Sequence, residues 1–133
     1  MSNLKATVTH IESCESLHIV KFDCYGQTLS MMSLELSEQI EAGTKVKLVI
    51  KPSHIAMAKD LSGEVSYSNQ LSVIVQSIEK GQLLSSVKLK WFDSTLESIT
   101  TVSSLTKMNL KVGDEVTALI KASEVSISEI CND

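Results

Sequence analysis

Apolar and polar residues alternate along short stretches through most of the chain. Leu4, Ala6 and Val8 are separated by polar or small residues, and Leu71 and Val73 continue the same spacing in the second half. A period of two is typical of strands that bury one face. Alternating or β-branched runs predict ten strands, at residues 4–11, 17–24, 27–32, 45–50, 54–57, 71–78, 84–91, 96–102, 115–120 and 125–128.

The pattern occurs twice. Residues 45–55 match residues 115–125, and the difference between Lys121 and Lys51 gives an offset of 70. Residues 4–12 match residues 71–79 at an offset of 67, so the second copy carries three extra residues in its middle (70 minus 67). Alternation alone does not explain why both copies contain Ile-Lys-x-Ser. The sequence therefore predicts an internal duplication.

Each copy has five predicted strands separated by turn signals such as Gly26, Gly43 and Gly113. Residues 33–41 and 103–111 are expected to form a short helical turn or a loop, and insertions are tolerated in such places. These features predict an all-β fold of two tandem OB-like five-stranded barrels, each with one short helical turn. The expected modules are residues 1–60 and 66–133, joined by a polar linker at 61–65. Modules this small are marginally stable alone, so partnership is expected.

Composition and charge exclude several classes of protein. The chain is 43% apolar, and no apolar run approaches the roughly 18 residues of a membrane-spanning helix. Its start lacks the layout of a signal peptide, so we expect a cytoplasmic protein without a membrane partner. The net charge is −4 and the twelve cations are scattered, which argues against a nucleic-acid partner. All twelve cations are Lys, and Arg, the usual bidentate clamp for anions, does not occur.

Candidates for catalysis or metal binding are weak. The histidines are scattered, the odd number of cysteines includes no Cys-x-x-Cys pair, and no spacing singles out two of the sixteen carboxylates. We therefore expect a protein that is not an enzyme and has no metal cation ligands. The His and Cys residues concerned are His10, His18, His54, Cys14, Cys24 and Cys131.

Anion binding has better support. The repeated Lys-x-Ser places an ammonium group and a hydroxyl at the end of a strand, beside backbone N–H groups that become free there. A single copy would suggest only a solvated Lys and a turn Ser, but two equivalent copies favour a function. Further hydroxyl and amide donors occur at residues 66–70 and 100–104, where ordinary loop and capping chemistry is the alternative interpretation.

Residues 66–71, 87–89, 99–102 and 110–125 together resemble the Mop or TOBE module of molybdenum-binding proteins. The most specific part is residues 113–125, which match the family's Gly-Asp-Glu-Val and Ile-Lys-Ala-Ser-Glu-Val. Residues 2–58 look like a diverged copy, so the whole chain is similar to the tandem, di-Mop form.

The resemblance implies OB-like barrels that associate into trimers or hexamers and hold oxyanions at interfaces between modules. Ser68 stands where the family has Arg, and Pro52 stands where the second copy has Ala122, which removes a backbone N–H. We therefore expect two classes of site. The oxyanion-binding residues that the resemblance implies are Lys121, Ala122, Ser123, Ser66, Ser68 and Asn69, with Thr101 or Ser104 from the middle loop and Lys51 and Ser53 from the first copy.

The expected function is binding of molybdate or tungstate as a ligand, for storage, transport or homeostasis, by a homo-oligomer in which a trimer is favoured. The alternative is a non-catalytic regulatory or interaction module that kept the fold and binds oxyanions weakly or not at all. The sequence does not rank molybdate against tungstate, because the two anions have nearly the same size and charge.

Overall fold

Strands form along the alternating runs because successive side chains lie on opposite faces of a sheet. The computed structural model describes residues 2–131 of the chain. In β1 (Ser2–Cys14), the side chains of Leu4, Ala6 and Val8 are buried and those between them are largely exposed. The matching strand β6 (Asn69–Lys80) buries its side chains in the same order.

The described residues form ten strands in two five-stranded sheets, which confirms the expected all-β fold. The remaining elements of the first copy are β2 (Leu17–Cys24), β3 (Gln27–Ser33), β4 (Lys45–Ile50), the 3₁₀ turn η1 (Pro52–His54) and β5 (Ala56–Ala58). Those of the second copy are β7 (Leu84–Trp91), β8 (Ser94–Thr101), α1 (Val102–Met108), β9 (Glu115–Ile120), the 3₁₀ turn η2 (Ala122–Glu124) and β10 (Ser126–Cys131).

The predicted bounds of β2, β4, β7 and β9 are confirmed, whereas two details of the prediction were wrong. His54 lies in η1 rather than in a strand, and Val102 begins α1 rather than ending β8. The middle segments were expected to form a helical turn or a loop, and both outcomes occur: residues 34–44 of the first copy form a loop with turns, and the second copy forms α1. The three extra residues of the second copy supply the length that a helix of two turns needs.

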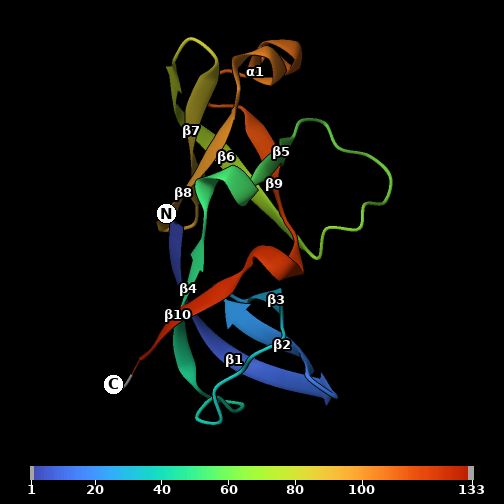
Figure 1. The fold of residues 1–133 in the computed structure, drawn as a ribbon. Coiled ribbons are helices and arrows are strands. Elements are labelled where there is room, and N and C mark those ends of the chain that lie inside the picture. The colour runs from blue at the N-terminus through green and yellow to red at the C-terminus, as the bar shows by residue number, and fades with distance from the viewer. Residues whose placement is uncertain (1, 132–133) are drawn as a thin grey trace.

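The fifth strands are exchanged between the copies. The first sheet has the order β10-β4-β1-β2-β3, and the second has the order β5-β9-β6-β7-β8. Thus β5 pairs with β9 through Met57 and Ala118, while β10 pairs with β4 through Ile127 and Leu48. Figure 1 shows the red β10 in the half of the molecule built from the first copy and the green β5 in the other half. Each sheet therefore contains four strands of one copy and the fifth strand of the other.

The duplication extends to individual hydrogen bonds. The N–H of Gly43 donates to the carbonyl of Val8 at 2.7 Å, and the N–H of Gly113 donates to the carbonyl of Val75 at 2.8 Å. The φ angles of these glycines are +95° and +94°, a conformation that L side chains rarely adopt. Both β1 and β6 also have a bulge just after the valine. The copies are therefore repeats in three dimensions as well as in sequence.

Equivalent residues of the two copies touch each other where the copies meet. Tyr25 stacks on its counterpart Phe92 with ring centroids 5.0 Å apart, and Trp91 contacts both rings edge-on. His54 meets its counterpart Glu124, with 2.8 Å between Nδ1 and Oε2. When counterparts touch, they lie close to a twofold axis, so the copies are related by an approximate twofold rotation.

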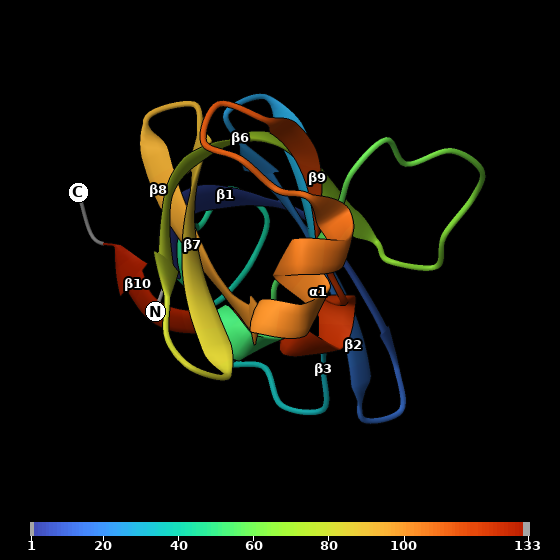
Figure 2. The ribbon, with the colours of Figure 1, turned by 90° about the horizontal axis from the view of Figure 1, so that it is seen from above.

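The linker after β5 lies outside the two barrels and extends away from the body as an open loop (Figure 2). Between residues 2 and 131 no helix is long and apolar enough to cross a membrane.

The three cysteines differ in their surroundings. Burial, with a contribution from Asp23, raises the pKa of the Cys24 thiol to about 11, and this thiol donates to the carbonyl of Lys5 at 3.2 Å. Cys14 is exposed and Cys131 is half-buried.

Candidate functional site

Two pockets lie where the copies meet, one beside the edges of each sheet. The first lies between the edge strands β5 and β8 and has a volume of about 590 Å³. The second lies between the edge strands β3 and β10 and has a volume of about 870 Å³. We call the first the lysine pocket, after Lys107 and Lys121, and the second the glutamate pocket, after Glu35 and Glu129.

Donors in the lysine pocket come from both copies. Lys121 follows the last residue of β9 and is the N-cap of η2, while Ser53 comes from the middle of η1 in the first copy. Ser104 and Lys107 come from α1, where a spacing of three residues places two side chains on the same helix face. All four side chains are exposed, so a ligand can reach them from solvent. The pocket thus combines two ammonium groups with two hydroxyls.

One carboxylate also faces the lysine pocket, and it has a partner. Glu124 Oε2 lies 2.8 Å from His54 Nδ1, and each side chain is about one third exposed, at 35% and 36%. Beside them, the buried Ser98 donates its hydroxyl to the carbonyl of Ile55 at 2.5 Å. This bond fixes the end of η1 on β8, because a buried carbonyl without a partner would cost about 1–3 kcal/mol.

Helix α1 forms the outer wall of the lysine pocket, and its ends are defined by side chains. Thr101 is the N-cap, and its hydroxyl accepts from the N–H of Ser104 at 3.1 Å and donates to the hydroxyl of Ser104 at 2.9 Å. Leu105 is the buried residue of the helix, and Asn109 ends it in the left-handed conformation with φ of 49°. The helix therefore presents Ser104 and Lys107 at a fixed place.

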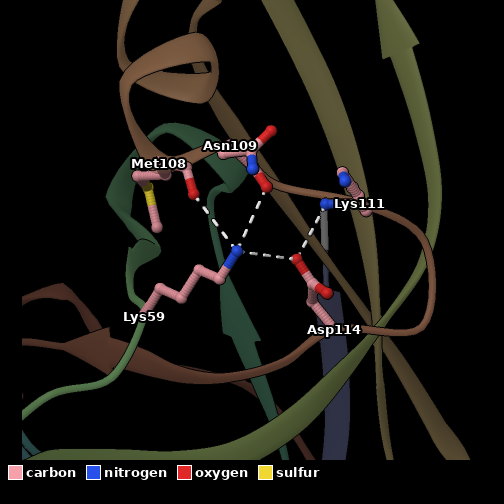
Figure 3. Close-up of polar contacts among 5 residues, drawn as sticks. All are labelled: Lys59, Met108, Asn109, Lys111 and Asp114. Carbon is pink, nitrogen blue, oxygen red and sulfur yellow. Dashed lines mark hydrogen bonds and ion pairs between the residues drawn. The ribbon is translucent and has the colours of Figure 1, made fainter.

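Lys59, at the start of the linker, holds the C-terminal end of α1 (Figure 3). Its Nζ donates to the carbonyls of Met108 at 3.3 Å and Asn109 at 3.1 Å, and lies 3.2 Å from Asp114 Oδ2. Asp114 Oδ2 also accepts from the N–H of Lys111 at 2.9 Å. These contacts, the backbone bond first, hold the pKa of Asp114 below its usual value. A cation at a helix C-terminus is favourable, because the last carbonyls lack partners within the helix.

The glutamate pocket has the same position in the other half of the molecule but different chemistry. Ser123 and Ser126 supply hydroxyls, and Met32 and Leu34 supply exposed apolar surface. No Lys or His of the described residues lines it. Nowhere in residues 2–131 do three or more His, Cys, Asp or Glu side chains come close enough together to hold a metal ion.

Known proteins match both the second copy by itself and nearly the whole chain. Residues 66–127 match the TOBE domain family. A structure of the cytoplasmic molybdate-binding protein ModG, with molybdate bound, is 28% identical and superposes with a TM-score of 0.89 over 94% of this chain and 93% of that one. A molybdate-binding protein from Sporomusa ovata is 30% identical, with a TM-score of 0.49 over 50% of this chain and all of that one, at 100%. The second half of the chain is thus a TOBE domain. Among curated proteins, none matches the sequence significantly.

The expectation of tandem Mop/TOBE modules is thereby confirmed, and this TOBE protein can be compared with the residues that its sequence implied. Three of them meet in the lysine pocket, namely Lys121, Ser104 and Ser53. Ser123 lies in the glutamate pocket instead. The two residues of the second Lys-x-Ser motif therefore face different pockets.

The remaining implied residues line neither pocket. Asn69 is buried, with both polar atoms of its amide bonded to the backbone of Ser30, and Thr101 serves as the cap of α1. The others are exposed or half-buried around the linker and the 3₁₀ turns: Ser66, Ser68, Lys51 and Ala122.

Sequence reasoning missed Lys107 and His54 as residues of the lysine pocket, whereas Tyr67 belongs to the donor stretch at residues 66–70. A signal existed for Lys107, because it follows Ser104 by three residues in a segment expected to be helical. The position of His54 depends on η1 contacting the other copy, which no local pattern indicates.

Proposed function

We propose that this TOBE protein binds molybdate or tungstate, and that the lysine pocket is a binding site. The observation that carries this proposal is the convergence of Lys107 and Lys121 with the hydroxyls of Ser53 and Ser104. The likeness to ModG, a molybdate-binding protein, supports the choice of anion. The cellular role that we propose is storage, transport or homeostasis of the oxyanion in the cytoplasm.

A tetrahedral dianion suits these groups. Hydroxyls and ammonium groups donate hydrogen bonds, and the ammonium charges offset the charge of the anion. Hydrogen phosphate carries a proton that would face another donor in such a site. The pocket should therefore prefer fully ionised oxyanions over protonated ones.

The proposal includes an oligomer, with a trimer favoured. Small barrels bury a limited share of their surface and are stabilised by neighbours. Exposed apolar side chains such as Leu34, Leu83 and Val112 offer surface for such contacts. Further oxyanions would be held where modules of different chains meet.

Isothermal calorimetry with molybdate, tungstate, sulfate and phosphate tests the proposal, using Lys121→Met as the main variant. The loss of one charge-assisted hydrogen bond should weaken molybdate binding about ten- to a hundredfold. The matched control is Lys51→Met, which removes the equivalent lysine of the first copy from a position outside both pockets, and it should bind as the parent does.

The absence of saturable heat with all four anions would defeat the proposal. It would favour the alternative of a regulatory or interaction module, which the lack of Arg also suggests. Equal losses in the two variants would mean that the site lies elsewhere.

A further inference from the structure

The two pockets are built from equivalent parts of the two copies. Ser53 of the lysine pocket corresponds to Ser123 of the glutamate pocket at the offset of 70, and Thr100 corresponds to Ser33 at the offset of 67. Each pocket combines the tail of one copy with the third strand and middle segment of the other. If position alone decided binding, both would take the same anion.

Their charges are opposite. The lysine pocket has two ammonium groups, from Lys107 and Lys121, and one carboxylate, which is paired with His54. Among residues 2–131, the lining of the glutamate pocket has two carboxylates and no ammonium group. One of these, Glu129, lies 2.9 Å from Lys47, whereas the other, Glu35, is exposed in a loop.

The difference arises from three positions. Lys51, the counterpart of Lys121, does not line the glutamate pocket. The residue at the offset of 70 from Lys107 is Ser37, which removes the second ammonium group. Glu35 then adds a negative charge in the segment where the second copy forms α1.

We propose that the duplicated fold has separated its two pockets by charge, so that the lysine pocket takes the oxyanion and the glutamate pocket excludes it. This inference rests on the proposed function and assigns its specificity to particular side chains. A dianion in the glutamate pocket would face Glu35, whose charge no lysine of the lining offsets, since Lys47 lies outside the lining and pairs with Glu129. Like charges at short range oppose binding.

The experiment adds one lysine to the glutamate pocket and counts bound molybdate by equilibrium dialysis. Glu35→Lys replaces the repelling carboxylate by an ammonium group and should add one tightly bound anion per chain. Glu38→Lys changes the net charge equally, but Glu38 is an exposed residue of the same loop outside the pocket. It should add none.

Two variants, each lacking one hydroxyl, show which pocket holds the anion in the parent protein. Ser53→Ala should weaken binding about five- to tenfold, the effect of one lost hydrogen bond, whereas Ser123→Ala should leave it unchanged. Equal losses in the two variants would place anions in both pockets and overturn the inference. So would a Glu35→Lys protein that binds no more molybdate than Glu38→Lys does.

Failure of this inference is distinguishable from failure of the proposed function. If the parent protein binds no molybdate, the proposed function fails. If it binds molybdate with equal contributions from Ser53 and Ser123, the function stands and only the separation by charge is wrong.

Discussion

Asn69 makes a fully buried contact between the copies through two hydrogen bonds. Its side chain is 1% exposed, its Oδ1 accepts from the N–H of Ser30 at 2.7 Å, and its Nδ2 donates to the carbonyl of Ser30 at 3.0 Å. The hydroxyl of the counterpart, Ser2, accepts from the N–H of Glu97 at 3.0 Å. The Asn69 amide thus bonds to the backbone of the edge strand β3, on the side where β3 has no neighbouring strand in its sheet.

Asn69→Ala should lower the free energy of unfolding by about 2–3 kcal/mol, because the buried N–H and C=O of Ser30 would lose their partners. Urea unfolding followed by circular dichroism measures the loss. Thr95→Ala, at an exposed position of β8, is the control and should change stability by less than about 0.5 kcal/mol. A loss equally small in Asn69→Ala would mean that water replaces the amide.

At the scale of elements, α1 shows how far the sequence predicts structure. The sequence indicated a helical turn or a loop at residues 103–111, with capping as one interpretation of the hydroxyls before it, and Thr101 does form the cap. The sequence did not indicate that Lys59, from the other copy, would hold the far end of the helix. Lys59 reaches the helix because β5, which directly precedes it, pairs with β9 of the second copy. This pairing is a property of the topology, and no local sequence pattern indicates it.

Lys59→Met should loosen α1. The carbonyls of Met108 and Asn109 would lose their cation, a contribution of about 0.3–1 kcal/mol, so the last amides of the helix should exchange about two- to fivefold faster. Hydrogen exchange followed by mass spectrometry measures the change. Lys80→Met, at the exposed end of β6, is the matched control and should leave exchange in α1 unaltered.

The partner of Lys59 gives the same contact a dependence on pH. Because the pKa of Asp114 is lowered in the folded protein, its contribution to stability is present above the ordinary value of 3.8 and is lost as the pH falls through the lowered pKa. Asp114→Asn should therefore differ from the parent protein in α1 exchange at neutral pH and converge with it in acid. A difference that stays constant down to the most acidic pH would assign the effect to packing.

At the scale of the whole molecule, alternation predicted ten strands but not their partners. The fifth strands exchange, and nothing in residues 54–57 or 125–128 distinguishes a strand that returns to its own sheet from one that crosses to the other. The same crossing explains why the repeated Lys-x-Ser motifs are divided between pockets. Ser53 reaches the lysine pocket only because η1 and β5 follow the second sheet.

The exchange predicts the behaviour of the second copy alone, residues 66–133. Without the first copy, β9 would lack its partner β5, and β10 would lack β4. Two such copies can satisfy both needs if the β10 of each pairs with the β9 of the other, since β5 and β9 are the counterparts of β10 and β4. Light scattering after gel filtration should give the mass of an even number of copies, because a reciprocal swap between two copies leaves no strand unpaired.

Such a dimer should also carry two pockets of the lysine type and no glutamate pocket, since each junction would combine Lys107 and Lys121 of one copy with Ser123 of the other. Glu124 of the other copy would stand in place of His54, so each pocket would gain a carboxylate. If the charges of the lining decide binding, the dimer should take up two molybdate anions more weakly than the parent protein binds one, and a dimer of Lys121→Met copies should bind more weakly still. Removal of residues 126–131 is the control and should prevent dimerisation. A folded monomer of residues 66–133 would contradict the prediction, because it would show that β10 can close its own barrel.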